Sequence, residues 1–197
     1  DVFEEEIKAQ ATADKAAIEV QNHTKALIMG VEHLKNNDFS HDFIKELHRI
    51  MLTGVISPKL QDSLGKYKTK DNKIVNRAKT VIFTPPSYTQ TEEYMDELIA
   101  YMNKEDDANP LVKAAIIHSQ FESIHPFQDG NGRIGRLIAF KQCLKNNFIP
   151  FYIDDANKWL YYRGLREWKS EKNYLIETCR FGQDQYKMIL DYFDIKY

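Results

Sequence analysis

The spacing of hydrophobic positions along the chain predicts a mainly helical protein. Apolar residues recur every three or four positions over most of the sequence, which is the period of a helix with one buried face. The pattern predicts helices over about 3–36, 40–54, 91–104, 110–124, 132–147, from about 155 to 165, and 174–192. The chain therefore contains enough amphipathic helix to build one core.

The first and last helices each carry one apolar stripe. In the first, the predicted buried positions are Val20, Thr24, Leu27, Val31 and Leu34, and Asn36-Asn37 end the helix. Its acidic beginning is expected to lie on the surface. In the last, the predicted buried positions are Leu175, Thr178, Phe181, Ile189 and Tyr192.

Residues 65–86 have a different character. Thr80–Thr84 is rich in β-branched and aromatic residues and is closed by Pro85-Pro86, and Lys73–Val75 precedes it as a second short run. These runs predict a two-stranded hairpin. Because an isolated hairpin is marginally stable, we expect it to lean on the helices.

The residues with the clearest chemistry lie between two apolar helical runs, from His125 to Arg136. A glycine-rich loop that opens a helix gathers unpaired N–H groups and the positive end of the helix dipole, which suit a phosphate. Asp129 can hold Mg²⁺ together with substrate phosphates. Arg133 and Arg136 share a helix face and can bind further phosphate oxygens. His125 has the ordinary pKa of a general base, so the stretch predicts a nucleotide-dependent transfer site.

This stretch resembles the signature HPFx(D/E)GNGRxxR of the Fic family, and every specified position is met. The resemblance implies a single mainly α domain over 1–197, a Fic-type helical bundle with one β-hairpin, the flap. Its parts are an N-terminal helical region (1–36), the flap (65–86), the catalytic helix–loop–helix (110–147) and C-terminal helices (148–197). It also implies a protein adenylyltransferase, which moves AMP from ATP to a hydroxyl of a target protein (AMPylation) and releases pyrophosphate.

The family resemblance assigns roles to the motif residues. His125 is the base for the target hydroxyl, and Asp129 is the ligand of Mg²⁺. Asn131 and the amides around Gly130 and Gly132 hold the α-phosphate of ATP, while Arg133 and Arg136 take the β- and γ-phosphates. The implied nucleotide-binding stretch is continuous and also includes Ile134 and Gly135.

The resemblance implies two further nucleotide contacts outside the motif. Residues Thr80, Val81, Ile82 and Phe83 match the part of the flap that borders the nucleotide, and the exposed flap edge would receive the target segment by strand addition. Tyr161 and Tyr162 match residues that line the adenine pocket, although an aromatic cluster usually belongs to a core. Where relatives show Gly-x-Tyr-Arg, this chain has Gly65, Tyr67 and Lys68.

Many Fic proteins restrain themselves with a helix that carries (S/T)xxxE(G/N), whose glutamate pairs with the second motif arginine, here Arg136. In this sequence no Glu is followed by Gly or Asn. The resemblance therefore predicts an inhibitory helix upstream or from a partner in trans. Without it we expect an unrestrained site that modifies the chain itself.

Composition narrows the function classes. The chain has 197 residues, is 43% hydrophobic and carries a net charge of −2, so wholesale nucleic-acid binding is not expected. No apolar run reaches a membrane span and no signal peptide is visible, which favours the cytoplasm and no membrane partner. Cys143 and Cys179 are expected as buried thiols. His41, His48 and His118 are expected as ordinary surface or core histidines.

Two alternatives to adenylyl transfer remain. One is transfer of another phosphate-containing group, as in Fic relatives that use UTP or CDP-choline, or in the Doc kinases. Doc-type loops replace the second motif glycine by Lys, whereas Gly132 is retained here. The other is a catalytically silent nucleotide-binding module, which the intact His125 argues against. The sequence does not indicate an oligomeric state.

Overall fold

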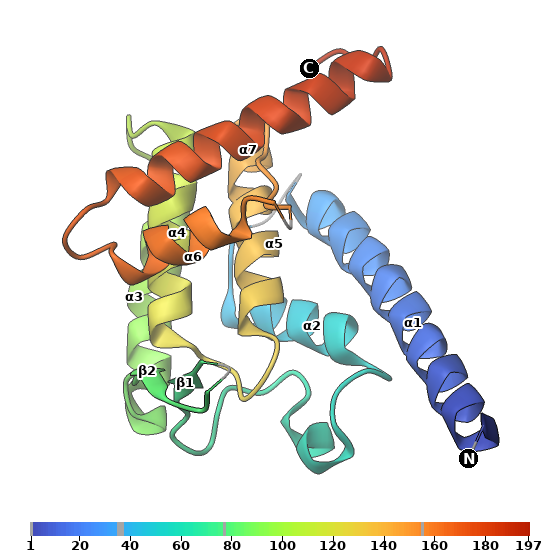
Figure 1. Cartoon of the computed structure of the whole chain (residues 1–197). Helices are drawn as coiled ribbons and strands as arrows, with labels where there is room; N and C mark the ends of the chain where they lie inside the picture. The colour runs from blue at the N-terminus through green and yellow to red at the C-terminus, as the bar shows by residue number, and fades with distance from the viewer. Residues whose placement is uncertain (1, 35–37, 77, 155) are drawn as a thin grey trace.

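The protein is a helical bundle with one small sheet (Figure 1). The computed structural model describes residues 2–34, 38–76, 78–154 and 156–197, with the side chains of 2–11 and 34 left outside the description. The helices are α1 Val2–Leu34, α2 His41–Leu52, α3 Thr91–Asn103, α4 Pro110–Ile124, α5 Asn131–Lys145, α6 Lys158–Arg166 and α7 Asn173–Tyr192. The strands are β1 Ile74–Val75 and β2 Val81–Phe83, and 3₁₀ turns cover Pro58–Ser63 and Tyr88–Gln90. The mainly α prediction is confirmed, and so is the hairpin, whose strands pair antiparallel.

Local signals set most helix ends. The hydroxyl of Ser40 accepts a hydrogen bond from the N–H of Phe43 at 3.2 Å and caps α2, as its sequence predicts. The side chain of Asn109 caps α4, and Pro110 fills the first helical position, where its missing N–H costs nothing. The predicted end of α1 at Asn36-Asn37 lies outside the described residues. Asp155, where the sequence predicts the start of the helix that corresponds to α6, lies outside them as well.

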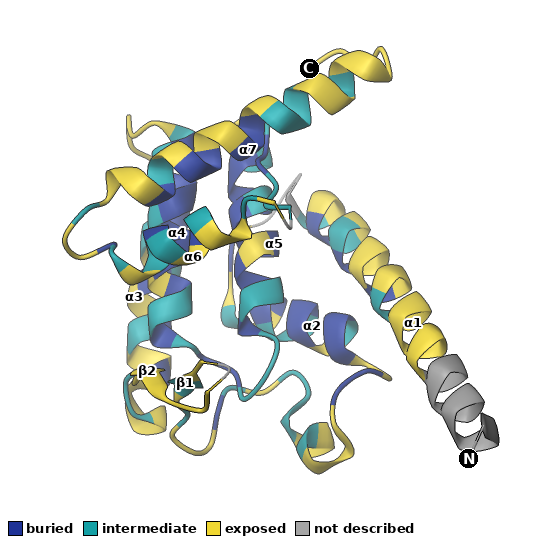
Figure 2. Cartoon of the chain, viewed as in Figure 1, coloured by how far each residue is buried: buried dark blue, intermediate teal, exposed yellow. Residues whose placement is uncertain are grey.

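Helices α4 and α5 run side by side through the middle of the molecule (Figure 1). One apolar cluster joins them to α2 and α3, and includes Phe121, Ile134 and Met95. A second joins them to α6 and α7, and includes Cys143, Leu175 and Cys179. Figure 2 shows the buried residues concentrated on these central helices. Because α4 and α5 are packed on both sides, the turn between them is fixed at both ends.

The buried face of α1 differs from the predicted stripe. Val20 and Val31 are 68% and 37% exposed, whereas Asn22 and Ala26 are 6% and 0% exposed. Small side chains let α1 approach its neighbours closely, and the amide of Asn22 donates to the carbonyl of Thr53 at 2.7 Å, just past the end of α2. The face of α1 that packs against α2 and is buried is therefore the one with Asn22 and Ala26, and not the predicted apolar stripe.

From Phe181 onward, α7 also departs from the predicted pattern of buried residues. Its residues Phe181, Ile189 and Tyr192 are 46%, 40% and 83% exposed, although Leu175 and Thr178 are buried as predicted. Figure 1 shows the end of this helix reaching past the body of the bundle, and Figure 2 shows it exposed. Among the described helices, none combines the length and the apolarity needed to cross a membrane. Both cysteines are buried free thiols, as predicted.

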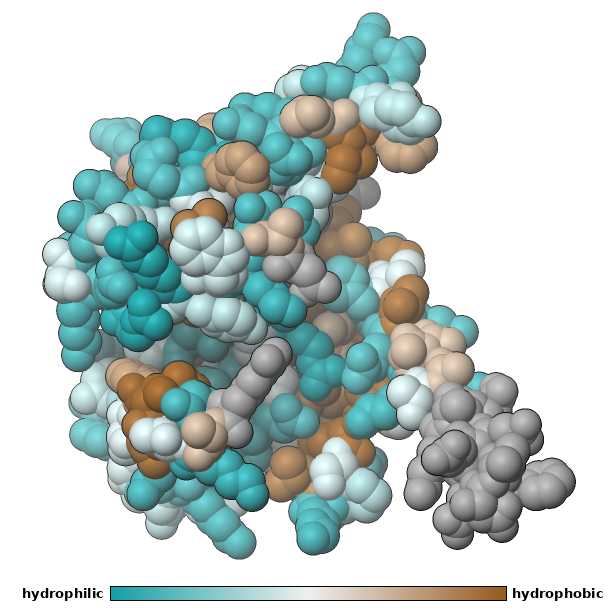
Figure 3. Space-filling model, in the orientation of Figure 1, coloured by the Kyte–Doolittle hydropathy of each residue, from teal (hydrophilic) through white to brown (hydrophobic). Residues whose placement is uncertain are grey.

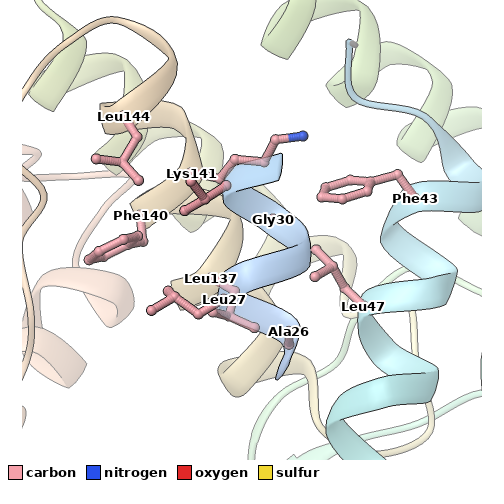
Figure 4. A pocket seen from close by; sticks show the side chains of 10 residues that line it. Ala26, Leu27, Gly30, Phe43, Leu47, Leu137, Phe140, Lys141 and Leu144 are labelled. Carbon is pink, nitrogen blue, oxygen red and sulfur yellow. The ribbon is translucent and has the colours of Figure 1, made fainter. Parts of the chain in front are cut away.

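Residues of α1, α2 and α5 line a small pocket, and Gly30 is one of them (Figure 4). The Lys141 ammonium nearby is 3.6 Å from the ring centre of Phe43 and 4.2 Å from that of Phe39, so two aromatic faces stabilise a charge that is otherwise removed from water. Burial lowers the pKa of Lys141 to about 7. A methyl group added at Gly30 would meet no atom within 4 Å, so this seam has unused space.

Two helical glycines give a matched test of this packing. A Cβ at Gly182 would lie 2.4 Å from the carbonyl oxygen of Tyr152, while the one at Gly30 is free of contacts. We expect Gly182→Ala to destabilise the fold by about 1–3 kcal/mol through overpacking. Gly30→Ala should be neutral or stabilise it by about 0.5–1 kcal/mol, because alanine is the better helix former. Thermal unfolding of both variants checks this, and equal midpoints would contradict the packing described here.

Candidate active site

The candidate site is the turn that connects α4 to α5. His125 ends α4 in the left-handed conformation, with φ 51° and ψ 60°. Such a backbone costs a residue other than glycine about 1–3 kcal/mol, so the surroundings must hold it. Phe127 follows and is fully buried, with its ring stacked on His48 at 4.0 Å between centres. Phe127 is therefore a core residue that fixes the loop.

Hydrogen bonds inside the turn fix its shape. The amide group of Asn131 accepts from the N–H of Phe127 and donates to its carbonyl, both at 2.8 Å. His48 accepts from the N–H of Gly65 through Nδ1 at 2.9 Å, so its Nε2 carries the proton and donates to the carbonyl of Asp129 at 3.2 Å. His48 is thus a core histidine, as expected, with a task in the turn. The Asn131 side chain is engaged within the turn, which leaves its backbone N–H facing outward from the helix start.

The start of α5 forms a cradle for an anion. Gly130 caps the helix with φ 77°, and a Cβ there would lie 2.8 Å from the side chain of Leu52, so only glycine fits. The N–H groups of Asn131 and Gly132 lie in the first turn, where an α-helix supplies no acceptor. Together with the helix dipole they favour a phosphate oxygen at this point. The geometry agrees with the phosphate role that the sequence predicts.

Asp129 is the only predicted metal ligand, and its surroundings fit a shared Mg²⁺ site. Its side chain is 45% exposed, with one oxygen accepting the N–H of Gly130 at 2.6 Å. The described residues contain no group of three or more His, Cys, Asp or Glu side chains placed to hold a metal. A single carboxylate suits Mg²⁺, which usually takes its remaining ligands from water and substrate phosphates.

The imidazole of His125 is uncharged at neutral pH. Burial lowers its pKa to about 4; the carbonyl of Glu122 opposes this shift, and the positive charge of Lys68 adds to it. A neutral imidazole is the form that accepts a proton. Nδ1 is buried and 3.9 Å from the Glu122 carboxylate, so Nε2 is the nitrogen that can face a substrate.

Three residues that the sequence predicts as nucleotide contacts are enclosed behind the turn, and one of them packs against the buried carboxyl of Glu122. Burial raises the pKa of Glu122 to about 7, and this carboxyl packs against Gly135, where a Cβ would lie 2.9 Å from it. Gly135 therefore faces α4 and not the cradle. Ile134 is fully buried in the core. Tyr161 is 2% exposed, with its hydroxyl hydrogen-bonded to His118, the hydrogen-bonded helix histidine expected from the sequence.

Packing between helices encloses Ile134, Gly135 and the Tyr161 ring, and the direct nucleotide contacts predicted for these three residues stay predictions. Tyr162 is 57% exposed, and its predicted adenine contact stays a prediction. Arg136 is exposed. Burial raises the pKa of Glu122 and lowers that of His118, and the charge of Arg136 opposes the first shift and adds to the second. Its predicted phosphate contact is untested by this geometry.

The flap lies beside the turn and exposes an apolar surface. Val81, Ile82 and Phe83 are 46%, 60% and 36% exposed, and Thr80 is exposed as well. Figure 3 shows apolar side chains gathered over this hairpin. The side chain of Gln128 in the turn donates to the carbonyl of Lys70 at 2.7 Å, which ties the flap base to the site.

Sequence reasoning missed one acid at the site. Glu19 of α1 lies 3.4 Å from a guanidinium nitrogen of Arg133, across 114 residues of sequence. The next residue is Val20 and position 15 is Lys, so Glu19 does not match the inhibitory pattern on either side. The expectation of an unrestrained site stays a prediction.

Comparison with known proteins agrees with this geometry. The profile of the Fic/DOC family matches residues 38–143, more than half of the chain and all of the turn. This chain belongs to the Fic/DOC family. Among curated relatives, protein adenylyltransferase fic-1 of Caenorhabditis elegans is 30% identical over 133 residues, covering 66% of this chain and 24% of that protein. A probable protein adenylyltransferase of Aquifex aeolicus is 27% identical over 101 residues, covering 51% of this chain and 31% of that protein.

Solved Fic structures share the fold. A Fic domain containing signaling protein from Bacteroides thetaiotaomicron superposes with a TM-score of 0.70 at 24% identity, over 86% of this chain and 68% of that one. Fic-1 residues 134–508 from C. elegans gives 0.66 at 22% identity, over 88% and 51%. BepC of Bartonella tribocorum, solved with bound AMPPNP, gives 0.61 at 13% identity, over 89% and 86%. The chain spans 24% and 31% of the length of the two curated relatives named above.

The buried titratable groups predict how stability depends on pH. Burial lowers the pKa values of three histidines from 6.5 to about 4: His48, His118 and His125. Below pH 6.5 these histidines therefore bind protons in the unfolded chain but remain neutral in the folded chain. Glu122, raised to about 7 from 4.5, works in the opposite direction and offsets one of these protons. We expect the unfolding free energy to fall between pH 6.5 and pH 5, with a slope of up to about 2.7 kcal/mol per pH unit for about two protons.

Urea unfolding across that window measures the slope. Glu122→Gln removes the offsetting proton and should steepen the slope toward about three protons. A pH-independent free energy of unfolding would contradict the burial of these histidines in their neutral form.

Proposed function

We propose that this chain is a protein adenylyltransferase that transfers AMP from ATP to a hydroxyl side chain of a target protein. The observation that carries the proposal is an uncharged His125 at the open end of a helix-start anion cradle, with one carboxylate and the Arg133 guanidinium beside it. A base beside a phosphate cradle is what transfer to a hydroxyl requires. The adenylyltransferase names of curated relatives support the same reaction.

The proposed step balances as follows. The hydroxyl oxygen of the acceptor forms a bond to the α-phosphorus of ATP, and the bond from that phosphorus to the bridging oxygen of the β-phosphate breaks. The acceptor proton passes to Nε2 of His125, and pyrophosphate leaves. A placed base of this kind contributes about 10²–10⁴-fold to the rate.

Each part of the site has a task in binding ATP. The N–H groups of Asn131 and Gly132 would hold the α-phosphate, and Arg133 and Arg136 the β- and γ-phosphates. Mg²⁺ on Asp129 would neutralise phosphate charge when bound. BepC, which shares the fold, is solved with bound AMPPNP, which supports nucleotide binding by a protein of this fold.

The flap is the proposed docking place of the acceptor. Its strands are two and three residues long and expose apolar side chains beside the turn. An extended target segment can add as a further strand, with main-chain hydrogen bonds setting its register. The acceptor hydroxyl would then lie next to His125.

Label transfer from ATP tests the reaction. With ATP labelled at the α-phosphate, we expect label on protein, including the chain itself, and a loss of about 10²–10⁴-fold in His125→Ala, which should still bind ATP because the cradle is intact. Label from the γ-phosphate would instead show a kinase. ATP binding without transfer would show a silent module, and either result would overturn the proposal.

We also propose that α1 restrains the site. The Glu19 carboxylate engages Arg133, which the incoming phosphates need, so ATP must displace it. The pair is 45% and 30% exposed, which limits its strength to that of a surface ion pair, about 0.2–1 kcal/mol. The further inhibitory helix upstream or in trans that the sequence predicts stays a prediction.

Glu19→Gln should release Arg133. We expect self-labelling at ATP concentrations below saturation to rise by up to about fivefold, the ratio that corresponds to about 1 kcal/mol. Glu32→Gln, on the same helix and exposed, is the matched control and should leave labelling unchanged. Unchanged labelling in Glu19→Gln would remove the restraint from the proposal and leave the transfer reaction standing.

A further inference from the structure

The backbone of His125 depends on the two peptide planes that flank it. The plane that ends in the Ile124 carbonyl sets φ of His125, and the plane that carries its own carbonyl sets ψ. Holding these two carbonyls in place therefore holds the strained left-handed conformation, and with it the direction of the imidazole.

Both carbonyls are bound by one segment, residues 68–72, which lies more than 50 positions earlier in the sequence. The Lys68 ammonium donates to the carbonyl of Ile124 at 3.0 Å. The Asn72 amide donates to the carbonyl of His125 at 3.3 Å and to that of Phe127 at 3.0 Å. The N–H of Lys68 donates to the carbonyl of Pro126 at 2.7 Å. Four consecutive carbonyls of the turn thus accept from this segment.

Lys68 is buried with its hydrogen bonds complete. Lys68 is 3% exposed. Besides the carbonyl of Ile124, its ammonium donates to the carbonyl of Pro86 at 2.9 Å and to Oδ1 of Asn72 at 3.2 Å. Three donors meet three acceptors, which is the full capacity of an ammonium. All three acceptors are neutral oxygens, so Lys68 is not the cation of a buried ion pair. Its charge is free to act on His125, whose proton affinity it lowers.

We propose that Lys68 and Asn72 are positioning residues for His125, which clamp the peptide planes on both sides of it so that the imidazole faces the acceptor. The inference rests on the proposed transfer reaction, because it gives the clamp a catalytic purpose. Neither residue forms part of the helix-start cradle. Asn72 lies two residues before β1. The segment that holds the backbone of His125 therefore continues directly into the flap, where the acceptor is proposed to dock.

Substitutions in the clamp should separate catalysis from ATP binding. Lys68→Met keeps most of the unbranched side chain and removes its donors, and Asn72→Ala removes the amide. Since a displacement of about 1 Å costs about 10²-fold in rate, we expect kcat for α-phosphate transfer to fall about 100-fold in each. KM for ATP should change by less than about twofold, as expected when uniform substrate binding is retained. Lys68→Arg restores donors and should recover most of kcat, and Lys66→Met, at an exposed lysine, should match the unsubstituted chain.

Hydrogen exchange gives a readout that does not depend on activity. Backbone amides of residues 125–129 should exchange faster in Lys68→Met and Asn72→Ala than in Lys66→Met, while amides within α2 and α5 keep their protection. If Lys68→Met does not fold, Asn72→Ala, at a half-buried surface position, decides the matter.

Two results would overturn the clamp: unchanged kcat with unchanged exchange in residues 125–129, or kcat and ATP affinity lost together. If the unsubstituted chain transfers no label, the proposed function fails, and the exchange measurement still decides whether residues 68–72 hold the turn.

Discussion

The structure depends on holding a strained turn rigid between two packed helices. His125 has a left-handed backbone and Gly130 a second one only five residues later, so the turn has little conformational preference of its own for this shape. Buried Phe127 anchors the centre of the turn against His48 from α2. Side chains from α2 and from residues 68–72 bind its carbonyls. The fold thus supplies from outside what the local sequence lacks.

Burial also sets the charge state of the site. Removing His125 from water favours the neutral imidazole, which is the form needed to take a proton. Burial also raises the pKa of the Glu122 carboxyl, although the positive charge of Arg136 opposes this shift. The positive groups Arg133 and Arg136 remain at the surface side, where an anionic ligand can reach them. The partly buried, neutral imidazole of His125 is therefore separated from the two more exposed cationic side chains, Arg133 and Arg136.

The two apolar clusters give the site a stiff frame and leave its edges adaptable. Helices α4 and α5 are packed on one side by α2 and α3 and on the other by α6 and α7. The flap and α1 have fewer buried apolar residues and touch the site through polar contacts such as the pair of Glu19 with Arg133. Elements held by few buried contacts open at lower free energy than the core, which suits parts that, under the proposed function, would admit ATP and an acceptor.

The sequence by itself determined the helices, the hairpin and the chemistry of the turn. Capping residues and helical spacing are local signals, so α4 was predicted from Pro110 to Ile124 as it stands, and the fixed spacing of the motif gave the residues at the turn. Tertiary structure decided which side of α1 is buried, because the close approach of α2 favoured Asn22 and Ala26 over the apolar stripe.

It also decided that Ile134, Gly135 and Tyr161 face the interior, and that Glu19, Lys68 and Asn72 reach the site. Periodicity shows that a helix has a buried face, but the neighbour that covers the face comes from a distant part of the chain. The partners of the turn lie between 53 and 114 residues away, and no local pattern records them.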